Sequence, residues 1–185
     1  FFHQEENVEE YIQMAKGYDG KILINMLKKH LSRNSTVLEL GMGPGTDLDL
    51  LNEYFMATGS DYSEIFIDRY RKVKPDADLL VLDAKNIDTD RKFQGIYSNK
   101  VLIHLTKAEL IQSISQQIQV LEPKGIICHS FWLGDKEEEY NGLKFVYYSE
   151  KHIRELFKEA FNILKIEKYS EMEPDDSLYI IGQKK

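Results

Sequence analysis

Cysteine is scarce in this sequence: Cys128 is the only one among 185 residues. A single cysteine excludes a disulfide within the chain and a zinc site built from several cysteines, and it favours a reducing, cytoplasmic setting. No apolar run approaches the length of a membrane span, so we expect no membrane partner. Basic residues are outnumbered as well, 24 Lys and Arg against 31 Asp and Glu, which gives a formal net charge of −7. This balance argues against a nucleic-acid partner, because such proteins usually carry a basic face.

The length of the chain fits one domain covering residues 1–185, large enough to bury a full core. The sequence begins at Phe1 with neither a methionine nor a signal-like apolar segment, and we take its first residues as incomplete or trimmed rather than as a targeting segment. Apolar residues recur at helical spacing from Val8 to about Leu31 and are interrupted at Gly17 and Gly20. We therefore expect two short helices, which make residues 1–31 an N-terminal helical cap.

A strand, a tight turn and a helix start follow one another over residues 36–47. The β-branched and aliphatic run Thr36–Leu40 predicts a short buried strand, and three alternating glycines then break it just before a helical pattern. Glycine permits a positive φ and lets a ligand approach the main chain, while the helix beyond points its unsatisfied N–H groups at the same spot. This is the geometry of a nucleotide-type cofactor cradle on the first βα turn of a doubly wound sheet.

Glu39 decides which kind of ligand suits that cradle. The dinucleotide fingerprint G-x-G-x-x-G needs glycine or alanine where Thr46 stands, and a carboxylate beside the loop would repel a pyrophosphate. A nicotinamide-dependent reductase is therefore disfavoured. A ligand that carries positive charge fits better.

The run ELGMGPGTD, from Glu39 to Asp47, resembles motif I of the class I S-adenosylmethionine-dependent methyltransferases, whose usual form is (D/E)-x-G-x-G-x-G. The resemblance implies S-adenosyl-L-methionine as the cofactor, because its ammonium and sulfonium suit an acidic residue in place of an anion cradle. It also implies that the cofactor is bound here by Glu39, Gly41, Met42, Gly43 and Gly45.

Asp61 ends the second predicted strand, residues 55–60, about twenty residues beyond the first glycine. At that distance a strand-end acid meets a ribose in two-strand nucleotide folds, and a carboxylate can accept hydrogen bonds from both ribose hydroxyls. The alternative is a cap for the helix that starts near Ser63, although Ser63 already offers one. Tyr62 is expected to lie along the adenine.

The third predicted strand, residues 79–82, reads as buried and is closed by Asp83 and Ala84. By resemblance, Asp83 bonds the adenine amino group and the backbone N–H of Ala84 meets a ring nitrogen. The alternative for Asp83 is a turn aspartate ahead of a short helix around residues 86–88.

The fourth predicted strand, residues 93–99, ends in Ser98 and Asn99, which the resemblance places near the sulfonium and the methionine moiety. Small-molecule members of the family also direct a tyrosine of the N-terminal helices to the methionine end, which makes Tyr11 and Tyr18 candidates. Both rings could instead pack against the sheet with the hydroxyl at the surface.

The fifth predicted strand, residues 126–131, carries His129. Methyl transfer needs a base only if the acceptor enters protonated, and His129 is the one catalytic candidate, against the alternative of a hydrogen-bonded structural histidine. His104 is assigned to closing the loop before its helix. The glutamates near residues 137–139 read as a solvated face, and the aromatic residues between Trp132 and Tyr148 suit an apolar acceptor pocket under the N-terminal helices.

Alternating strands and helices up to the fifth strand predict an α/β fold with a mostly parallel, doubly wound sheet. The resemblance implies seven strands in the order 3-2-1-4-5-7-6, the last one antiparallel, in a Rossmann-like methyltransferase fold. The expected function is methyl transfer to a small-molecule acceptor by in-line displacement, without a metal. A non-catalytic S-adenosylmethionine-binding regulatory module and a protein or RNA methyltransferase are the alternatives. The acceptor, its reacting atom and the oligomeric state stay open.

Overall fold

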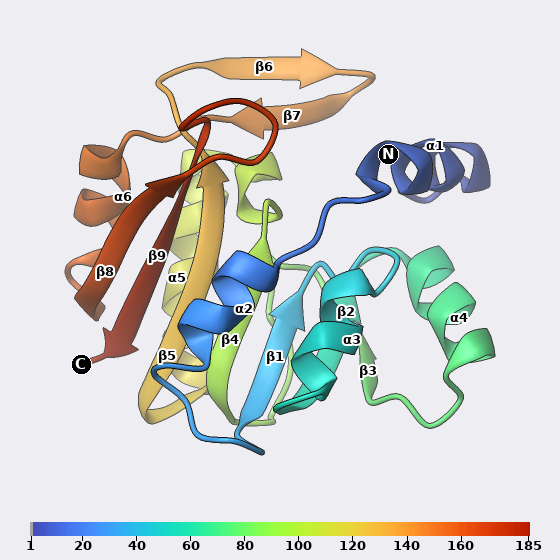
Figure 1. The fold of residues 1–185 in the computed structure, drawn as a ribbon, viewed down its shortest axis with the longest axis horizontal. Coiled ribbons are helices and arrows are strands. Elements are labelled where there is room, and N and C mark those ends of the chain that lie inside the picture. The colour runs from blue at the N-terminus through green and yellow to red at the C-terminus, as the bar shows by residue number, and fades with distance from the viewer. Residues whose placement is uncertain (1) are drawn as a thin grey trace.

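A seven-stranded sheet forms the centre of the molecule (Figure 1). The computed structural model describes residues 2–185, so Phe1, at the start expected to be incomplete or trimmed, lies outside the described residues. The strands of this sheet are β1 (Thr36–Leu40), β2 (Met56–Asp61), β3 (Leu79–Val81), β4 (Phe93–Asn99), β5 (Leu121–Trp132), β8 (Phe161–Tyr169) and β9 (Ser177–Lys184). The helices are α1 (Glu5–Ala15), α2 (Lys21–Leu27), α3 (Thr46–Asn52), α4 (Glu64–Val73), the 3₁₀ helix η1 (Leu102–His104), α5 (Lys107–Val120) and α6 (Glu150–Phe157).

The strand order is β3-β2-β1-β4-β5-β9-β8. Strand β1 pairs in parallel with β2 and with β4, and β5 continues the parallel sheet beside β4. The last strand, β9, runs antiparallel to both β5 and β8. The predicted order 3-2-1-4-5-7-6 is confirmed, because the labels differ only by the separate two-stranded sheet β6 (Glu137–Tyr140) and β7 (Leu143–Val146).

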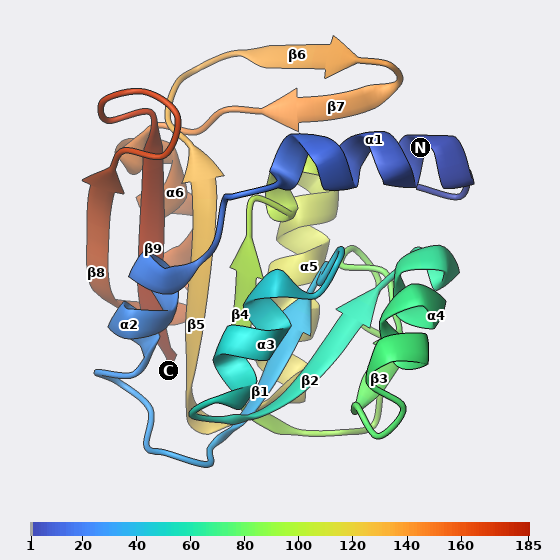
Figure 2. The ribbon, with the colours of Figure 1, turned by 45° about the vertical axis from the view of Figure 1, so that its right-hand side comes forward.

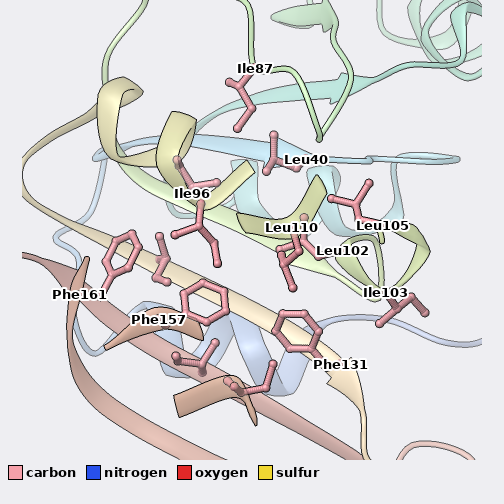
Figure 3. Packing of buried hydrophobic residues seen from close by; sticks show 14 of the residues in the cluster. Leu40, Ile87, Ile96, Leu102, Ile103, Leu105, Leu110, Phe131, Phe157 and Phe161 are labelled. Carbon is pink, nitrogen blue, oxygen red and sulfur yellow. The ribbon is translucent and has the colours of Figure 1, made fainter. Parts of the chain in front are cut away.

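The central strands are buried on both faces because helices cover each side. Side chains of β1 alternate between two clusters: Leu38 and Leu40 join the cluster that holds residues of α5 and α6, while Val37 joins the one that holds residues of α2, α3 and α4. Figure 2 shows these two groups of helices on opposite sides of the sheet. The first cluster includes Phe131 and Phe157, whose ring centroids are 6.2 Å apart (Figure 3).

The two N-terminal helices form where residues 8–31 predicted them, as α1 and α2. The capping box of α5 is present: the Thr106 side chain accepts from the Glu109 N–H, and the Glu109 carboxylate accepts from the Thr106 N–H. Such a box supplies partners for N–H groups that a helix start leaves unsatisfied. No helix of residues 2–185 is long and apolar enough to cross a bilayer.

Four local expectations are corrected. Strand β3 is a short edge strand rather than a buried one, with Val81 55% exposed. The short helix around residues 86–88, which belonged to the alternative for Asp83, is absent, since Asp83 pairs with Asn86 in a β-bridge. Strand β5 begins at Leu121, five residues before the predicted start at residue 126, and its pairing with β4 is irregular between Phe93 and Gly95. Finally, the acidic segment forms the β6–β7 hairpin, although its glutamates are exposed as expected.

Candidate functional site

The carboxyl ends of β1, β2 and β4 open onto a cleft with two adjoining lobes of about 290 and 300 Å³. We call them the Asp61 lobe, which Tyr62, Asp83 and Ala84 also line, and the Glu39 lobe, which Met42 and Asn99 also line. Helix α1 and the β6–β7 hairpin lie over this end of the sheet (Figure 2). The residues that line both lobes are Tyr11, Gly41, Gly43, Lys100, His104 and Leu143.

The three glycines of the turn have positive φ values, yet they serve different purposes. Gly43 faces the cleft, where an added Cβ would find only the Tyr11 ring, at 3.6 Å. Gly45 is absent from the lining of both lobes: at φ +89° it is the N-cap residue that precedes α3, and a Cβ there would lie 2.2 Å from the ring of Tyr70. Gly45 is therefore needed for packing and Gly43 exposes main chain to the cleft. Gly41 does both, since it lines both lobes and an added Cβ would lie 2.5 Å from the Val101 side chain.

Glu39 is 3% exposed and lines the Glu39 lobe, and its Oε2 atom has no hydrogen-bond partner. Burial, followed by repulsion from Asp47 and Asp61, raises the pKa of this carboxyl well above its usual value. A buried carboxyl oxygen without a partner is costly unless a ligand supplies one. The cradle thus fits a group that donates hydrogen bonds and carries positive charge.

Asp61 ties the end of β2 to the glycine turn. Its Oδ2 accepts from the Gly43 N–H at 2.9 Å, and its Oδ1 accepts from the Ser63 N–H at 2.9 Å. Burial raises the pKa of Asp61, and these backbone N–H groups oppose that shift. The expectation that Ser63 caps α4 with its own side chain is wrong, because its hydroxyl donates to the Phe2 carbonyl instead.

The Asp61 lobe contains the other residues that the resemblance assigned to adenosine. Tyr62 accepts a hydrogen bond on its hydroxyl from the Phe2 N–H, at 3.3 Å. Asp83 accepts from the Lys85 N–H at 3.0 Å, which is the turn geometry that the alternative interpretation anticipated. Ala84 follows it in the lining of the same lobe. The structure therefore brings Asp61, Tyr62, Asp83 and Ala84 together.

Asp47 is a buried carboxylate that the sequence did not single out. It lines the Glu39 lobe and accepts hydrogen bonds from the Gly20 N–H (2.7 Å), the Tyr97 hydroxyl (2.7 Å) and the Asn99 amide (3.1 Å). Tyr18 lies on the same lobe and is 42% exposed. All three of these partners are neutral groups, so no cation of residues 2–185 is hydrogen-bonded to Asp47.

Two predicted site residues are placed elsewhere. Ser98 and His129 are fully buried and hydrogen-bonded to each other at 2.8 Å, and His129 Nε2 reaches Gln117 of α5 at 2.8 Å. Side chains alternate along a strand, so Ser98 faces away from the side taken by Asn99. Burial lowers the pKa of His129 to about 3. His129 is thus a structural histidine, and neither residue offers a side chain to the cleft.

His104 is the histidine that faces the cleft. Its Nδ1 lies 2.7 Å from the carbonyl oxygen of Lys144 in β7 and must carry the proton, because a carbonyl only accepts. Burial lowers the pKa of His104. The neutral ring therefore keeps a lone pair on Nε2. The prediction that His104 closes the loop accounts for its Nδ1 and said nothing of its Nε2.

Lys100 is the second residue that sequence reasoning missed. It follows β4 with φ +56°, and burial lowers the pKa of its ammonium. Its Nζ pairs with Glu171, donates to the Tyr169 hydroxyl at 3.1 Å and lies 3.8 Å from the centroid of the Trp132 ring. The Lys100 ammonium is therefore already occupied by an ion pair, a hydrogen bond and an aromatic ring. Within residues 2–185 no group of His, Cys, Asp and Glu is arranged to hold a metal ion.

The comparisons with known proteins agree with this architecture. Residues 37–125 match a family model described as "Methyltransferase domain". A curated relative, dTDP-3-amino-3,4,6-trideoxy-alpha-D-glucopyranose N,N-dimethyltransferase of Streptomyces venezuelae, is 27% identical over 127 residues, which are 66% of this chain and 54% of that protein. The chain thus spans about half the length of this relative.

Two solved structures share the fold. One is 1,6-didemethyltoxoflavin-N1-methyltransferase of Burkholderia thailandensis with S-adenosylhomocysteine, with a TM-score of 0.78, 18% identity, and coverage of 89% of this chain and 77% of that one. The other is the N-methyltransferase NodS of Bradyrhizobium japonicum WM9 with S-adenosyl-l-homocysteine, with a TM-score of 0.71, 18% identity, and coverage of 89% and 84%.

Proposed function

This chain belongs to the class I S-adenosylmethionine-dependent methyltransferases, and from that premise we propose that it transfers a methyl group from S-adenosylmethionine to a small-molecule acceptor. One observation carries the proposal. A buried carboxyl oxygen of Glu39 lacks a partner at the edge of an open glycine turn, in a cleft at the carboxyl ends of parallel strands. Open α/β sheets bind their ligands at that edge.

We assign the cleft to the methyl donor residue by residue. Asp61 would hold the ribose hydroxyls, and Asp83, Ala84 and Tyr62 would surround the adenine in the Asp61 lobe. The methionine end would lie in the Glu39 lobe, against the main chain of the glycine turn and its neighbours. These neighbours are Glu39, Gly41, Met42, Gly43, Asn99, Tyr11 and Tyr18.

When bound, S-adenosylmethionine supplies a methyl group on a positively charged sulfur. Such a transfer is an in-line displacement, so the protein has to hold the acceptor in line and to leave it with a free lone pair. His104 suits the second requirement, because its Nδ1 is fixed by the Lys144 carbonyl and its Nε2 can take a proton from an acceptor in the cleft. The apolar walls around it would exclude water from the reacting atoms.

The proposal includes residues 1–31 as a cap over the cleft, since Tyr11 of α1 and Tyr18 beyond it line the lobes. A cytoplasmic location goes with it, as the single cysteine suggests. Neither a nucleic acid nor a membrane is part of the proposed reaction.

Calorimetry with S-adenosylmethionine and S-adenosylhomocysteine tests the donor site first. We expect micromolar-range binding of both ligands. Incubation with S-adenosylmethionine labelled in its methyl group and a panel of metabolites then tests turnover. Binding without transfer to any member of a broad panel would favour a non-catalytic regulatory module, and the absence of binding would overturn the proposal.

A further inference from the structure

The mouth of the Glu39 lobe has an apolar rim that the methyl donor does not explain. Four large side chains that line this lobe are exposed to solvent: Met14 (51%), Tyr18 (42%), Tyr140 (58%) and Met172 (60%). They come from α1, the segment after it, the β6–β7 hairpin and the loop between β8 and β9. Convergence of exposed apolar side chains from distant segments on one opening marks a binding surface rather than scattered exposure.

The interior of the same lobe continues this apolar surface. Ile103, Leu143, Phe145 and Trp132 line it, and Phe145 packs edge-on against the His104 ring at 4.9 Å between centroids. An acceptor that reached the region of His104 from the rim would therefore pass along hydrocarbon and aromatic walls. Burying an apolar body there would contribute most of its affinity.

The charges in the cleft restrict the polar end of such an acceptor. Within residues 2–185, the carboxylates that line the lobes outnumber the cations. Lys100 is paired with Glu171, and Lys85 lies 3.8 Å from Asp83 and 3.7 Å from Glu109. Both lining cations are thus committed to protein carboxylates, and none is left for a phosphate or a carboxylate of the acceptor. The lining carboxylates are Glu39, Asp47, Asp61, Asp83, Glu109 and Glu171.

We propose that the acceptor is an amine with an apolar body: its amino end lies in the carboxylate-lined part of the Glu39 lobe, and its apolar part lies between Met14, Tyr18, Tyr140 and Met172. This inference rests on the proposed function and names the substrate class of that site. Glu39 is assigned to the methyl donor, so the amino end of the acceptor is placed beside the other two carboxylates that line this lobe, Asp47 and Glu171. Nucleotide-linked sugars, with their two phosphates, are excluded by the same charges.

Trp132 provides a direct measure of binding in this lobe, because it is the only tryptophan in the chain and lines the lobe. The experiment titrates the full chain, saturated with S-adenosylhomocysteine so that no turnover occurs, and follows Trp132 fluorescence. The probes are phenylalkylamines of two to four methylenes, 4-phenylbutanoate, 4-phenylbutanol and thymidine diphosphate. We expect the amines to bind, with about threefold tighter binding per added methylene.

The matched carboxylate, 4-phenylbutanoate, should bind at least about tenfold more weakly than 4-phenylbutylamine, because it meets the same apolar walls and the opposite charge. Thymidine diphosphate should not bind. The inference would be overturned if 4-phenylbutanoate or thymidine diphosphate bound as tightly as 4-phenylbutylamine. It would also be overturned if the affinity for the amines did not change with the number of methylenes.

Two variants test the two halves of the site. Met172→Ser should weaken the binding of 4-phenylbutylamine about three- to tenfold. Met56→Ser is its matched control, since Met56 is 62% exposed and lines neither lobe. Glu171→Gln frees Lys100, so the preference for the amine over the carboxylate should fall about tenfold. Unchanged selectivity in a folded Glu171→Gln variant would contradict the role given to charge.

The outcomes separate this inference from the proposed function. Calorimetric binding of S-adenosylhomocysteine without any preference for amines would overturn the acceptor class and leave methyl transfer intact. Absence of S-adenosylhomocysteine binding would overturn the proposed function itself.

Discussion

The Asp61 carboxylate accepts a hydrogen bond from the Gly43 N–H at 2.9 Å and so joins the end of β2 to the glycine turn after β1. The same carboxylate holds the Ser63 N–H through its other oxygen. One side chain therefore shapes two loops of the proposed donor site, and it still has lone pairs free to meet ribose hydroxyls.

Asp61→Ala should weaken S-adenosylmethionine binding about 10- to 100-fold, because hydrogen bonds to a charged group contribute about 1.5–3 kcal/mol. Calorimetry measures the loss, and thermal unfolding shows whether the variant is folded. Asp68→Ala is the control, since Asp68 is exposed on α4 and its pair with Arg71 lies at the surface. A folded Asp61→Ala variant with unchanged affinity would remove Asp61 from the donor site.

Glu39 should release a proton when S-adenosylmethionine binds. Its pKa is raised by burial and by neighbouring carboxylates, and a cationic ligand at its free oxygen would lower that pKa again. The affinity should therefore increase as the pH rises from the usual carboxyl range toward the raised value. Calorimetry in buffers of different ionisation enthalpy counts the released protons, and Glu39→Gln should reduce that number. If Glu39→Gln released as many protons as the parent on binding S-adenosylmethionine, the released proton would come from another group.

The fold was readable from the sequence because its signals are local. The run Thr36–Leu40 carries apolar residues on both faces (Val37, Leu38 and Leu40), as expected of a strand covered on both sides, and the helix signals between strands indicate parallel pairing. The β6–β7 hairpin was missed although Asn141 and Gly142, which have positive φ values, are a strong hairpin turn signal. Its strand of glutamates lacks the apolar alternation on which the prediction relied.

The site was predicted less completely because orientation depends on packing. The residue types at the ends of β1, β2 and β3 could be found by spacing, yet whether Ser98 or Asn99 faces the cleft depends on how β4 sits between the helices on its two sides. The two histidines show the same limit: His129 lies in β5 and His104 follows β4, and only the structure places one behind the sheet and the other in the cleft.

His129 should make the protein less stable in mild acid. Its pKa of about 3 in the folded protein lies below the ordinary histidine value near 6.5. Between about pH 6.5 and 3, His129 therefore binds a proton in the unfolded chain but not in the folded one. Stability is thus lost as the pH falls toward 3, by up to about 1.4 kcal/mol per pH unit from this group. Urea unfolding at several pH values should give a shallower acid loss in His129→Gln than in the parent. Parallel curves would contradict the neutral, buried histidine.

Two glycines with similar φ values provide a matched test of the turn. Gly45 (φ +89°) lies against the ring of Tyr70, whereas Gly17 (φ +92°) has nothing within 4 Å of an added Cβ. Gly17→Ala should cost about 1 kcal/mol of stability from backbone strain alone. Gly45→Ala adds a clash with a buried ring and should cost about 2–4 kcal/mol. Urea unfolding measures both, and equal losses would show that Tyr70 moves aside freely.

His104 should govern the pH dependence of methyl transfer for an acceptor that enters protonated. Because burial lowers its pKa, the rate attributable to His104 falls only as the pH drops below the usual histidine range near 6.5. His104→Gln should lower kcat about 10²- to 10⁴-fold at neutral pH. With an amine acceptor, much of the rate should return as the pH rises toward the amine's own pKa, because the free amine needs no base. His152→Gln is the control, because the His152 side chain is 43% exposed, lies 3.7 Å from Asp135 and lines neither lobe. Steady-state kinetics over pH 5–10, with S-adenosylhomocysteine affinity measured in parallel, make the test. A loss in His104→Gln that is the same at every pH would assign the residue to packing against Phe145 and not to proton transfer.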